Sequence, residues 1–85
     1  MCRNITILRG LEPAATPEEI EAAAMQYVRK VSGVTRPGPA TAEAFDRAVR
    51  AIAEVTAELL EGLPPRRNPP RTVPPLRRLN RPLSA

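Results

Sequence analysis

The residues best suited to recognition chemistry are six arginines near the C-terminus, in a segment that contains no acidic residue: Arg66, Arg67, Arg71, Arg77, Arg78 and Arg81. The formal net charge of +4 is therefore unevenly distributed: residues 1–63 hold seven Arg or Lys and all nine acids, and residues 64–85 hold the six arginines. Guanidinium groups stay charged and bind phosphate or carboxylate oxygens through paired hydrogen bonds. The sequence thus predicts that residues 64–85 contact an anionic partner, which could be RNA, DNA or an acidic protein. The tail has no aromatic residue to stack on bases, so binding to nucleic acid should depend on the phosphate backbone and show little sequence preference.

Two smaller features could also carry chemistry. The α-amine and thiolate of Cys2 could together chelate a metal if Met1 is removed, whereas the plainer alternative is an ordinary thiol. Tyr27, with Arg29 and Lys30, could form a recognition face at the end of a helix. The alternative is that Tyr27 packs in the core while the two cations stabilise the helix end. We favour the plainer alternative in both cases.

Acid–base catalysis finds little support in the sequence. Glu54 and Glu58 have the i, i+4 spacing that could pair an acid with a base, and Glu61 follows them, but a solvated helix face explains the three equally well. The chain has no His and a single Cys, which excludes a histidine-based catalytic triad, an intramolecular disulfide and a zinc site of the usual ligand number. We therefore predict no enzyme activity and no cofactor. The N-terminus lacks the apolar core of a signal peptide and no segment is long enough to span a membrane, so we expect a cytoplasmic protein.

The first long helix is predicted over residues 17–32. Thr16 and Pro17 suit the start of a helix, and Glu19 completes a capping box with Thr16. Gly33 can adopt the left-handed conformation that ends it. Apolar residues recur at helical spacing along one face: Ile20, Ala23, Ala24, Tyr27, Val28 and Val31.

A second helix is predicted over residues 42–61, after a Gly- and Pro-containing loop, with Thr41 as its N-cap. The loop is short enough for the two helices to pack as antiparallel neighbours. The two apolar stripes predict that Phe45 and Ile52 are core residues that face four residues of the first helix: Ile20, Ala24, Tyr27 and Val31. Residues 4–11 are apolar but too few to distinguish a helical turn from a short strand.

The composition changes at Pro64, where a five-residue repeat begins with Pro-Pro pairs at 64, 69 and 74. Such a segment favours extended polyproline II structure. An alternative is that the tail folds back over the hairpin through its apolar residues Val73, Leu76 and Leu79. The predicted fold is therefore all-α: a helical hairpin domain over residues 1–63, possibly with a third helix, and a basic proline-rich tail over residues 64–85.

Four features of the predicted hairpin form a known pattern: Leu8-Arg9-Gly10-Leu11, residues 15–20 (Ala-Thr-Pro-Glu-Glu-Ile), Phe45 and Ala51. In these residues the hairpin resembles the J-domain of heat-shock co-chaperones. It implies a short first helix followed by an antiparallel pair. J-domains stimulate their chaperone through a His-Pro-Asp tripeptide, which residues 32–34 (Ser-Gly-Val) replace here. The resemblance thus implies the fold without that activity.

Three stretches of the sequence have a more specific character: the start Met-Cys-Arg-Asn-Ile, residues 13–20 (Pro-Ala-Ala-Thr-Pro-Glu-Glu-Ile) and residues 26–33 (Gln-Tyr-Val-Arg-Lys-Val-Ser-Gly). Together they closely resemble a family of small bacterial proteins, domain-of-unknown-function family 2277. This resemblance covers residues 1–63 and implies no activity, cofactor or site, and we expect the Pro/Arg repeat to be less characteristic of the family.

The leading functional interpretation is a small non-catalytic binding or adaptor protein whose tail contacts an anionic partner. One alternative is a structural subunit that forms homo-oligomers through the apolar face of the hairpin, as small domains with few large side chains often require. A third, weaker alternative is a metal- or thiol-linked protein that uses Cys2.

Overall fold

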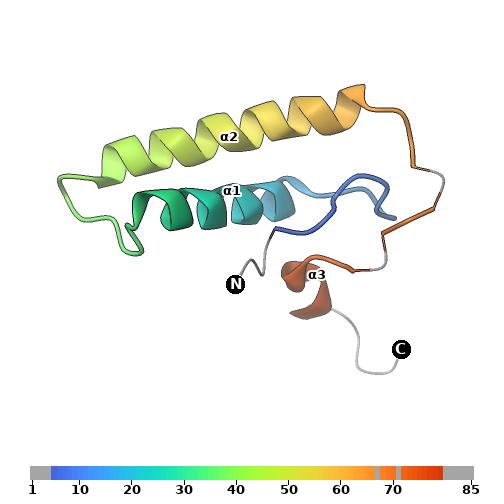
Figure 1. Cartoon of the computed structure of the whole chain (residues 1–85), viewed down its shortest axis with the longest axis horizontal. Helices are drawn as coiled ribbons and strands as arrows, with labels where there is room; N and C mark the ends of the chain where they lie inside the picture. The colour runs from blue at the N-terminus through green and yellow to red at the C-terminus, as the bar shows by residue number, and fades with distance from the viewer. Residues whose placement is uncertain (1–4, 67, 71, 80–85) are drawn as a thin grey trace.

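The protein is a helical hairpin of α1 (Pro17–Ser32) and α2 (Ala42–Gly62), followed by a short helix α3 (Pro75–Leu79) (Figure 1). The computed structural model describes residues 5–66, 68–70 and 72–79, except for the side chains of residues 78 and 79. All the regular structure in these ranges is helical. The predicted all-α hairpin is confirmed, and its two long helices begin at the predicted residues.

The start and end of α1 follow from local hydrogen bonds. The backbone N–H of Glu19 donates to Thr16 Oγ1 at 3.1 Å, and the backbone N–H of Thr16 donates to Glu19 Oε1 at 2.9 Å. This is the predicted capping box, which satisfies N–H groups that have no partner inside the helix. At the other end Gly33 has φ +73°, and its N–H donates to the carbonyl of Arg29 at 3.0 Å.

The loop before α2 uses Thr41 differently from the predicted cap. Thr41 occupies the N-cap position, but its side chain makes no capping bond to the helix. Its hydroxyl instead accepts a hydrogen bond from the N–H of Gly38 at 3.0 Å, which closes a turn in the loop. Helix α2 extends to Gly62, one residue beyond the predicted end, and the N–H of Leu63 donates to the carbonyl of Leu59.

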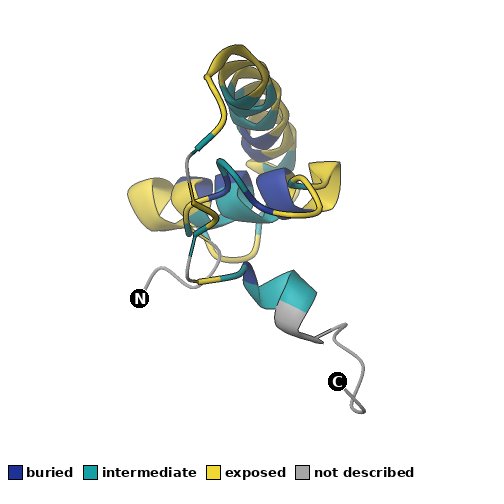
Figure 2. Ribbon diagram, turned by 90° about the vertical axis from the view of Figure 1, so that its right-hand side faces the viewer, coloured by how far each residue is buried: buried dark blue, intermediate teal, exposed yellow. Residues whose placement is uncertain are grey.

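The core consists of two small clusters, one between the two long helices and one that joins the N-terminal segment to them (Figure 2). The first joins Ala24 and Val28 of α1 to Phe45 and Val49 of α2. The second cluster packs Leu8 and Leu11, which precede α1, against Ile20 in the first turn of α1. Partly buried alanines of α2 pack against the second cluster, so the N-terminal segment extends the core.

The predicted core is correct for Phe45 but wrong for Tyr27 and Val31. Phe45 is 6% exposed, whereas Tyr27 and Val31 are 49% and 65% exposed. Ile52 is half-buried and packs against the first cluster. With only one long helix as a neighbour, α1 buries a narrow stripe, and residues at the margin of its apolar face stay in solvent.

Residues 5–15 form neither a helix nor a strand, so the first helix implied by the J-domain resemblance is absent. The segment is interrupted by Gly10, at φ +88°, and by Pro13, whose ring and missing N–H disfavour a continuous helix. The third helix of this fold lies in the tail instead. Figure 1 shows α3 beneath the start of α1, where Arg77 contacts the hairpin.

Candidate functional site: the arginine tail and its clasp

The tail runs back along the N-terminal segment after it leaves α2. Arg9 Nε donates a hydrogen bond to the carbonyl of Pro64 at 2.8 Å. Arg66 then lies over Gly10 so closely that a Cβ on this glycine would be 2.9 Å from the Arg66 Cβ. Farther along, Pro74 is completely buried. The described part of the tail is therefore attached to the hairpin at several points.

The sequence suggested that the tail folds back over the hairpin through Val73, Leu76 and Leu79. Val73 and Leu76 are half-buried, and the side chain of Leu79 lies outside the described part of the structure. The charged residue Arg77 contributes the hydrogen bonds that join α3 to α1, so the contact shown between these two helices is polar.

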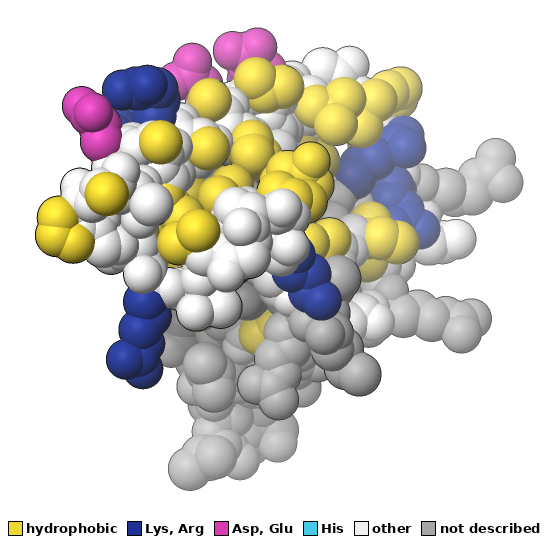
Figure 3. Space-filling view, turned by 60° about the vertical axis from the view of Figure 1, so that its left-hand side comes forward, with side chains coloured by type: hydrophobic (Ala, Val, Ile, Leu, Met, Phe, Trp, Pro, Cys, Tyr) yellow, Lys and Arg dark blue, Asp and Glu magenta, His cyan; other side chains and the backbone are white. Residues whose placement is uncertain are grey.

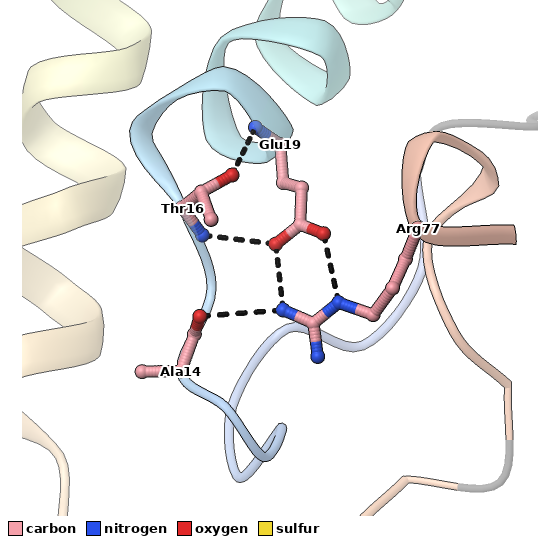
Figure 4. A network of polar contacts seen from close by, with 4 residues as sticks. All are labelled: Ala14, Thr16, Glu19 and Arg77. Carbon is pink, nitrogen blue, oxygen red and sulfur yellow. Dashed lines mark hydrogen bonds and ion pairs between the residues drawn. The ribbon is translucent and has the colours of Figure 1, made fainter. Parts of the chain in front are cut away.

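The strongest polar contact of the tail is a clasp formed by Arg77, Glu19 and the carbonyl of Ala14 (Figure 4). Arg77 Nε donates to Glu19 Oε2 and Arg77 Nη2 donates to Glu19 Oε1, each at 2.9 Å. Nη2 also donates to the Ala14 carbonyl at 3.2 Å. Such a paired, charge-assisted arrangement fixes both distance and orientation. The Arg77 clasp thus ties residue 77 to the N-terminus of α1.

The clasp is buried, and this determines the electrostatics of Glu19. The side chains of Arg77 and Glu19 are only 20% and 5% exposed. Burial by itself raises the pKa of the Glu19 carboxyl, but hydrogen bonds from Arg77 and Thr16, together with the positive charge of Arg77, hold the pKa below its ordinary value. The folded protein therefore stabilises the ionised form of the Glu19 carboxyl group.

A lowered pKa predicts how stability depends on pH. Because the pKa of Glu19 is lower in the folded protein than its unfolded value of about 4.3, the ionised group stabilises the fold above that pH. The stabilisation is lost as the pH falls through the lower, folded pKa. Urea unfolding at a series of pH values should show that Glu19→Gln destabilises the protein near neutral pH, with the difference from wild type shrinking in acid.

The matched control for this prediction is Glu18→Gln, which removes a neighbouring but exposed carboxylate. We expect its stability to follow the wild-type pH profile closely. A Glu19→Gln profile parallel to that of the wild type through the acid range would contradict the assigned role of Glu19.

The structure places only part of the predicted arginine site. Arg66 is half-buried over Gly10, and Arg77 is held in the clasp. Arg78 belongs to α3, but its side chain is not described, and Arg67, Arg71 and Arg81 lie outside the described residues. Among the described residues of the tail, Arg77 is the one that forms an ion pair. Sequence reasoning had no means of separating this anchoring arginine from the other five.

A groove lies between the N-terminal segment, the start of α1 and the C-terminal half of α2. Its volume is about 730 Å³, and its walls include Leu8, Leu11, Ala57 and Leu60. Glu21, Glu54 and Glu61 also line it, and all three are exposed. Glu58 of the same helix is exposed as well, in agreement with the solvated-face interpretation of these carboxylates.

The other residues proposed from the sequence for recognition or metal binding are Arg29, Lys30 and Cys2. Arg29 and Lys30 are exposed in the last turn of α1, and Cys2 lies outside the described residues. In the part of the chain that the structure describes, no three His, Cys, Asp or Glu residues group as metal ligands. The same residues include no helix with both the length and the apolar character needed to cross a membrane.

Comparison with known proteins identifies a family without assigning a role. The sequence model of one family, described as "Uncharacterized conserved protein (DUF2277)", matches residues 1–81. No match was found among curated proteins or among solved structures. The match extends well beyond residue 63, so the Pro/Arg segment, which we expected to be less characteristic, falls within the family. The chain therefore belongs to the DUF2277 family of uncharacterized conserved proteins.

Proposed function

We propose that the protein is a non-catalytic binding module whose tail arginines contact an anionic partner. The observation that carries the proposal is the separation of charge: the tail has six arginines and no acid, while the preceding 63 residues have a balance of −2. Arg77 forms an ion pair with Glu19 and so anchors the segment to the hairpin. The other five arginines are the candidates for the external anion: Arg66, Arg67, Arg71, Arg78 and Arg81.

The phosphate backbone of a nucleic acid is the first anion to test. Arginine forms paired hydrogen bonds with phosphate oxygens. In extended polyproline II structure the chain rises about 3.1 Å per residue, so successive Pro-Pro pairs of the repeat would be roughly 15 Å apart. Arg66, Arg67 and Arg71 belong to this repeat before α3 begins at Pro75, and arginines spaced in this way could contact several phosphates. If all five engaged duplex DNA, the slope of log affinity against log salt would approach about −4.5.

The test compares two full-length variants with equal changes in charge. The first replaces the five candidate arginines with Gln and keeps Arg77, so the clasp is preserved. The second replaces five exposed cations of the hairpin with Gln: Arg29, Lys30, Arg36, Arg47 and Arg50. We expect salt titrations with RNA and DNA to show most of the affinity lost in the tail variant and retained in the hairpin variant.

One outcome would contradict the proposal, and another would change the anion to be tested. Equal losses in both variants would show that overall charge, and not the tail, determines binding. No binding by the wild-type chain at low salt would exclude the nucleic-acid backbone as the anion, and the same pair of variants would then be tested against an acidic protein surface such as polyglutamate.

A further inference from the structure

The groove between the N-terminal segment and α2 is lined mainly by small and apolar side chains. Ala53, Ala57 and Leu60 of α2 contribute one wall, and the N-terminal segment contributes Leu8 and Leu11 to the other. Its volume of about 730 Å³ lies within the range of about 300–1,000 Å³ that is usual for ligand sites. None of the described tail residues lines it, so this part of the tail leaves the groove open.

The border of the groove is acidic. Glu21 of α1 and Glu54 and Glu61 of α2 line it, and all three are exposed. Arg9 also lines the groove, with its guanidinium bonded to a backbone carbonyl of the tail. Within the part of the chain that the structure describes, the three carboxylates form no ion pair or hydrogen bond. We call this apolar groove with its three unpaired carboxylates the acidic groove.

The end of α2 beside the acidic groove carries its charge against the usual preference of a helix. Residues 51–62 hold three acids and no Lys or Arg, whereas α1 has acids in its first turn and cations in its last. The carboxyl end of a helix has a negative partial charge, so acids near it are unfavourable, and like charges at i, i+4 such as Glu54 and Glu58 repel each other. Figure 3 shows acidic side chains along the upper edge of the molecule, the side on which α2 lies in Figure 1. A cation bound at the groove would relieve this unfavourable charge.

We infer that the acidic groove binds a basic segment of a partner protein, in which aliphatic side chains lie between two Lys or Arg residues. An aliphatic side chain would enter the space beside Ala57, and the two cations would reach Glu54 and Glu61. These two glutamates are seven positions apart on α2, which is about 10.5 Å along the helix axis. In an extended peptide, residues three positions apart are separated by about 10 Å, so the spacing of Lys-Leu-Leu-Lys matches.

The wall formed by residues 8–15 favours a peptide over a small amine. These residues form neither a helix nor a strand. Within the described part of the chain, their backbone hydrogen bonds are that from the Leu11 N–H to the Leu8 carbonyl, at 3.5 Å, and that from Arg77 to the Ala14 carbonyl. Backbone groups without an intramolecular partner can bond to the main chain of an extended peptide. Phosphates and anionic lipids would be repelled by the carboxylates, so this site is separate from the anion site proposed for the tail.

The test is an NMR titration of the ¹⁵N-labelled full-length protein with the synthetic peptide acetyl-Gly-Lys-Leu-Leu-Lys-Gly-amide, up to about 5 mM. We expect saturable shifts of the backbone signals of Leu8, Ala57 and Leu60. Two control peptides have the cores Glu-Leu-Leu-Glu and Lys-Gly-Gly-Lys. Each should bind at least about fivefold more weakly, because the first reverses the charge and the second lacks the aliphatic side chains.

Two kinds of variant test the charge and the shape of the acidic groove separately. Glu54→Gln combined with Glu61→Gln should weaken binding of the Lys-Leu-Leu-Lys peptide about fivefold. Ala57→Leu fills part of the groove without changing its charge and should weaken binding by about the same factor. The matched control combines Glu43→Gln with Asp46→Asn, which removes two exposed carboxylates from the other end of α2 and should leave the affinity within about twofold of wild type. Far-UV circular dichroism checks that each variant keeps its helices, and if Ala57→Leu unfolds, the glutamine pair decides the question.

Four outcomes would overturn the inference. The first is the absence of saturable shifts at the groove residues, and the second is equal binding of the three peptides. The third is equal weakening by the groove variants and the control variant, because overall charge would then determine binding. The fourth is a shift of the groove signals when the protein alone is concentrated, because the occupant would then be the basic tail of a second copy. The tail is unchanged in all variants and only shifts at the groove are counted, so the result does not depend on whether the tail binds an anion.

Discussion

Replacing Phe45 with alanine is expected to lower the free energy of unfolding by about 3–5 kcal/mol, the usual cost of removing a buried aromatic ring. Phe45 is 6% exposed and joins Ala24, Val28 and Val49 in the first core cluster. It is the only phenylalanine in the chain, and there is no tryptophan. The buried alanine and valine side chains of this cluster are too small to fill the space that the ring would leave, and the larger Met25 and Ile52 are only partly buried against it.

The expected loss is large relative to total stability. Single domains are stable by about 5–15 kcal/mol, so Phe45→Ala would remove roughly a fifth or more of that stability. In a chain of this length each kcal/mol shifts the melting temperature by about 4–8 °C, which predicts a decrease of at least 12 °C or so. Thermal and urea unfolding, followed by circular dichroism, measure both quantities.

Two further variants test whether the effect comes from the lost ring. Phe45→Leu keeps most of the volume and should cost less than half as much as alanine. Arg50→Ala changes an exposed residue about one turn away on α2 and should alter stability by no more than about 0.5 kcal/mol. If the Phe45→Ala and Arg50→Ala proteins had the same melting temperature, the ring would not contribute to a packed core.

The same core shows how far the sequence predicts this fold. The capping box at Thr16 and Glu19 and the left-handed Gly33 depend on local chemistry, so the limits of α1 could be predicted. Local periodicity also identified Phe45. The exposure of Tyr27 and Val31 could not be predicted from periodicity, because it depends on how much of α1 its single long neighbour covers.

The tail was harder to predict because its structure depends on contacts distant in sequence. Its proline pairs predict an extended chain, and nothing local indicates the short helix α3. Arg77 meets Glu19 across 58 positions, and five other arginines have the same chemistry. The capping box did place Glu19 at the helix start, but its second role, as the acceptor for Arg77, follows only from the path of the tail.

Arg77→Ala is the second change for which we expect a large effect, a loss of about 2–3 kcal/mol in the free energy of unfolding. The substitution removes two hydrogen bonds to a carboxylate and one to the Ala14 carbonyl. Glu19 would remain buried and would keep its hydrogen bond from the Thr16 N–H. Hydrogen bonds to charged groups contribute about 1.5–3 kcal/mol, and loss of one partner of a buried pair costs about 3–5 kcal/mol. We expect the lower range because Arg77 lies at the edge, 20% exposed, where water could reach the vacated carboxylate.

The exposed pair Arg47–Glu43 provides an internal comparison. Its side chains are 72% and 89% exposed, and the two charged atoms are 3.7 Å apart. Arg47→Ala should therefore cost no more than about 0.5 kcal/mol, as is usual for an i, i+4 pair in solvent. Arg77→Lys should fall between Arg77→Ala and wild type, because lysine keeps the charge but cannot donate two parallel hydrogen bonds. Equal costs for Arg47→Ala and Arg77→Ala would contradict the buried clasp.

A double-mutant cycle with Glu19→Gln separates the clasp from other effects of losing Arg77. If the two side chains act through each other, Arg77→Ala should cost at least about 1 kcal/mol less in the Glu19→Gln protein than in wild type, because the buried charge that needs a partner is already gone. Hydrogen exchange at residues 76–79 gives an independent measure, since loss of the clasp should speed exchange there more than in α2. Additive costs in the cycle, with unchanged exchange at these residues, would mean that α3 is held by its apolar contacts and that Arg77 is as free as the other arginines to bind an external anion.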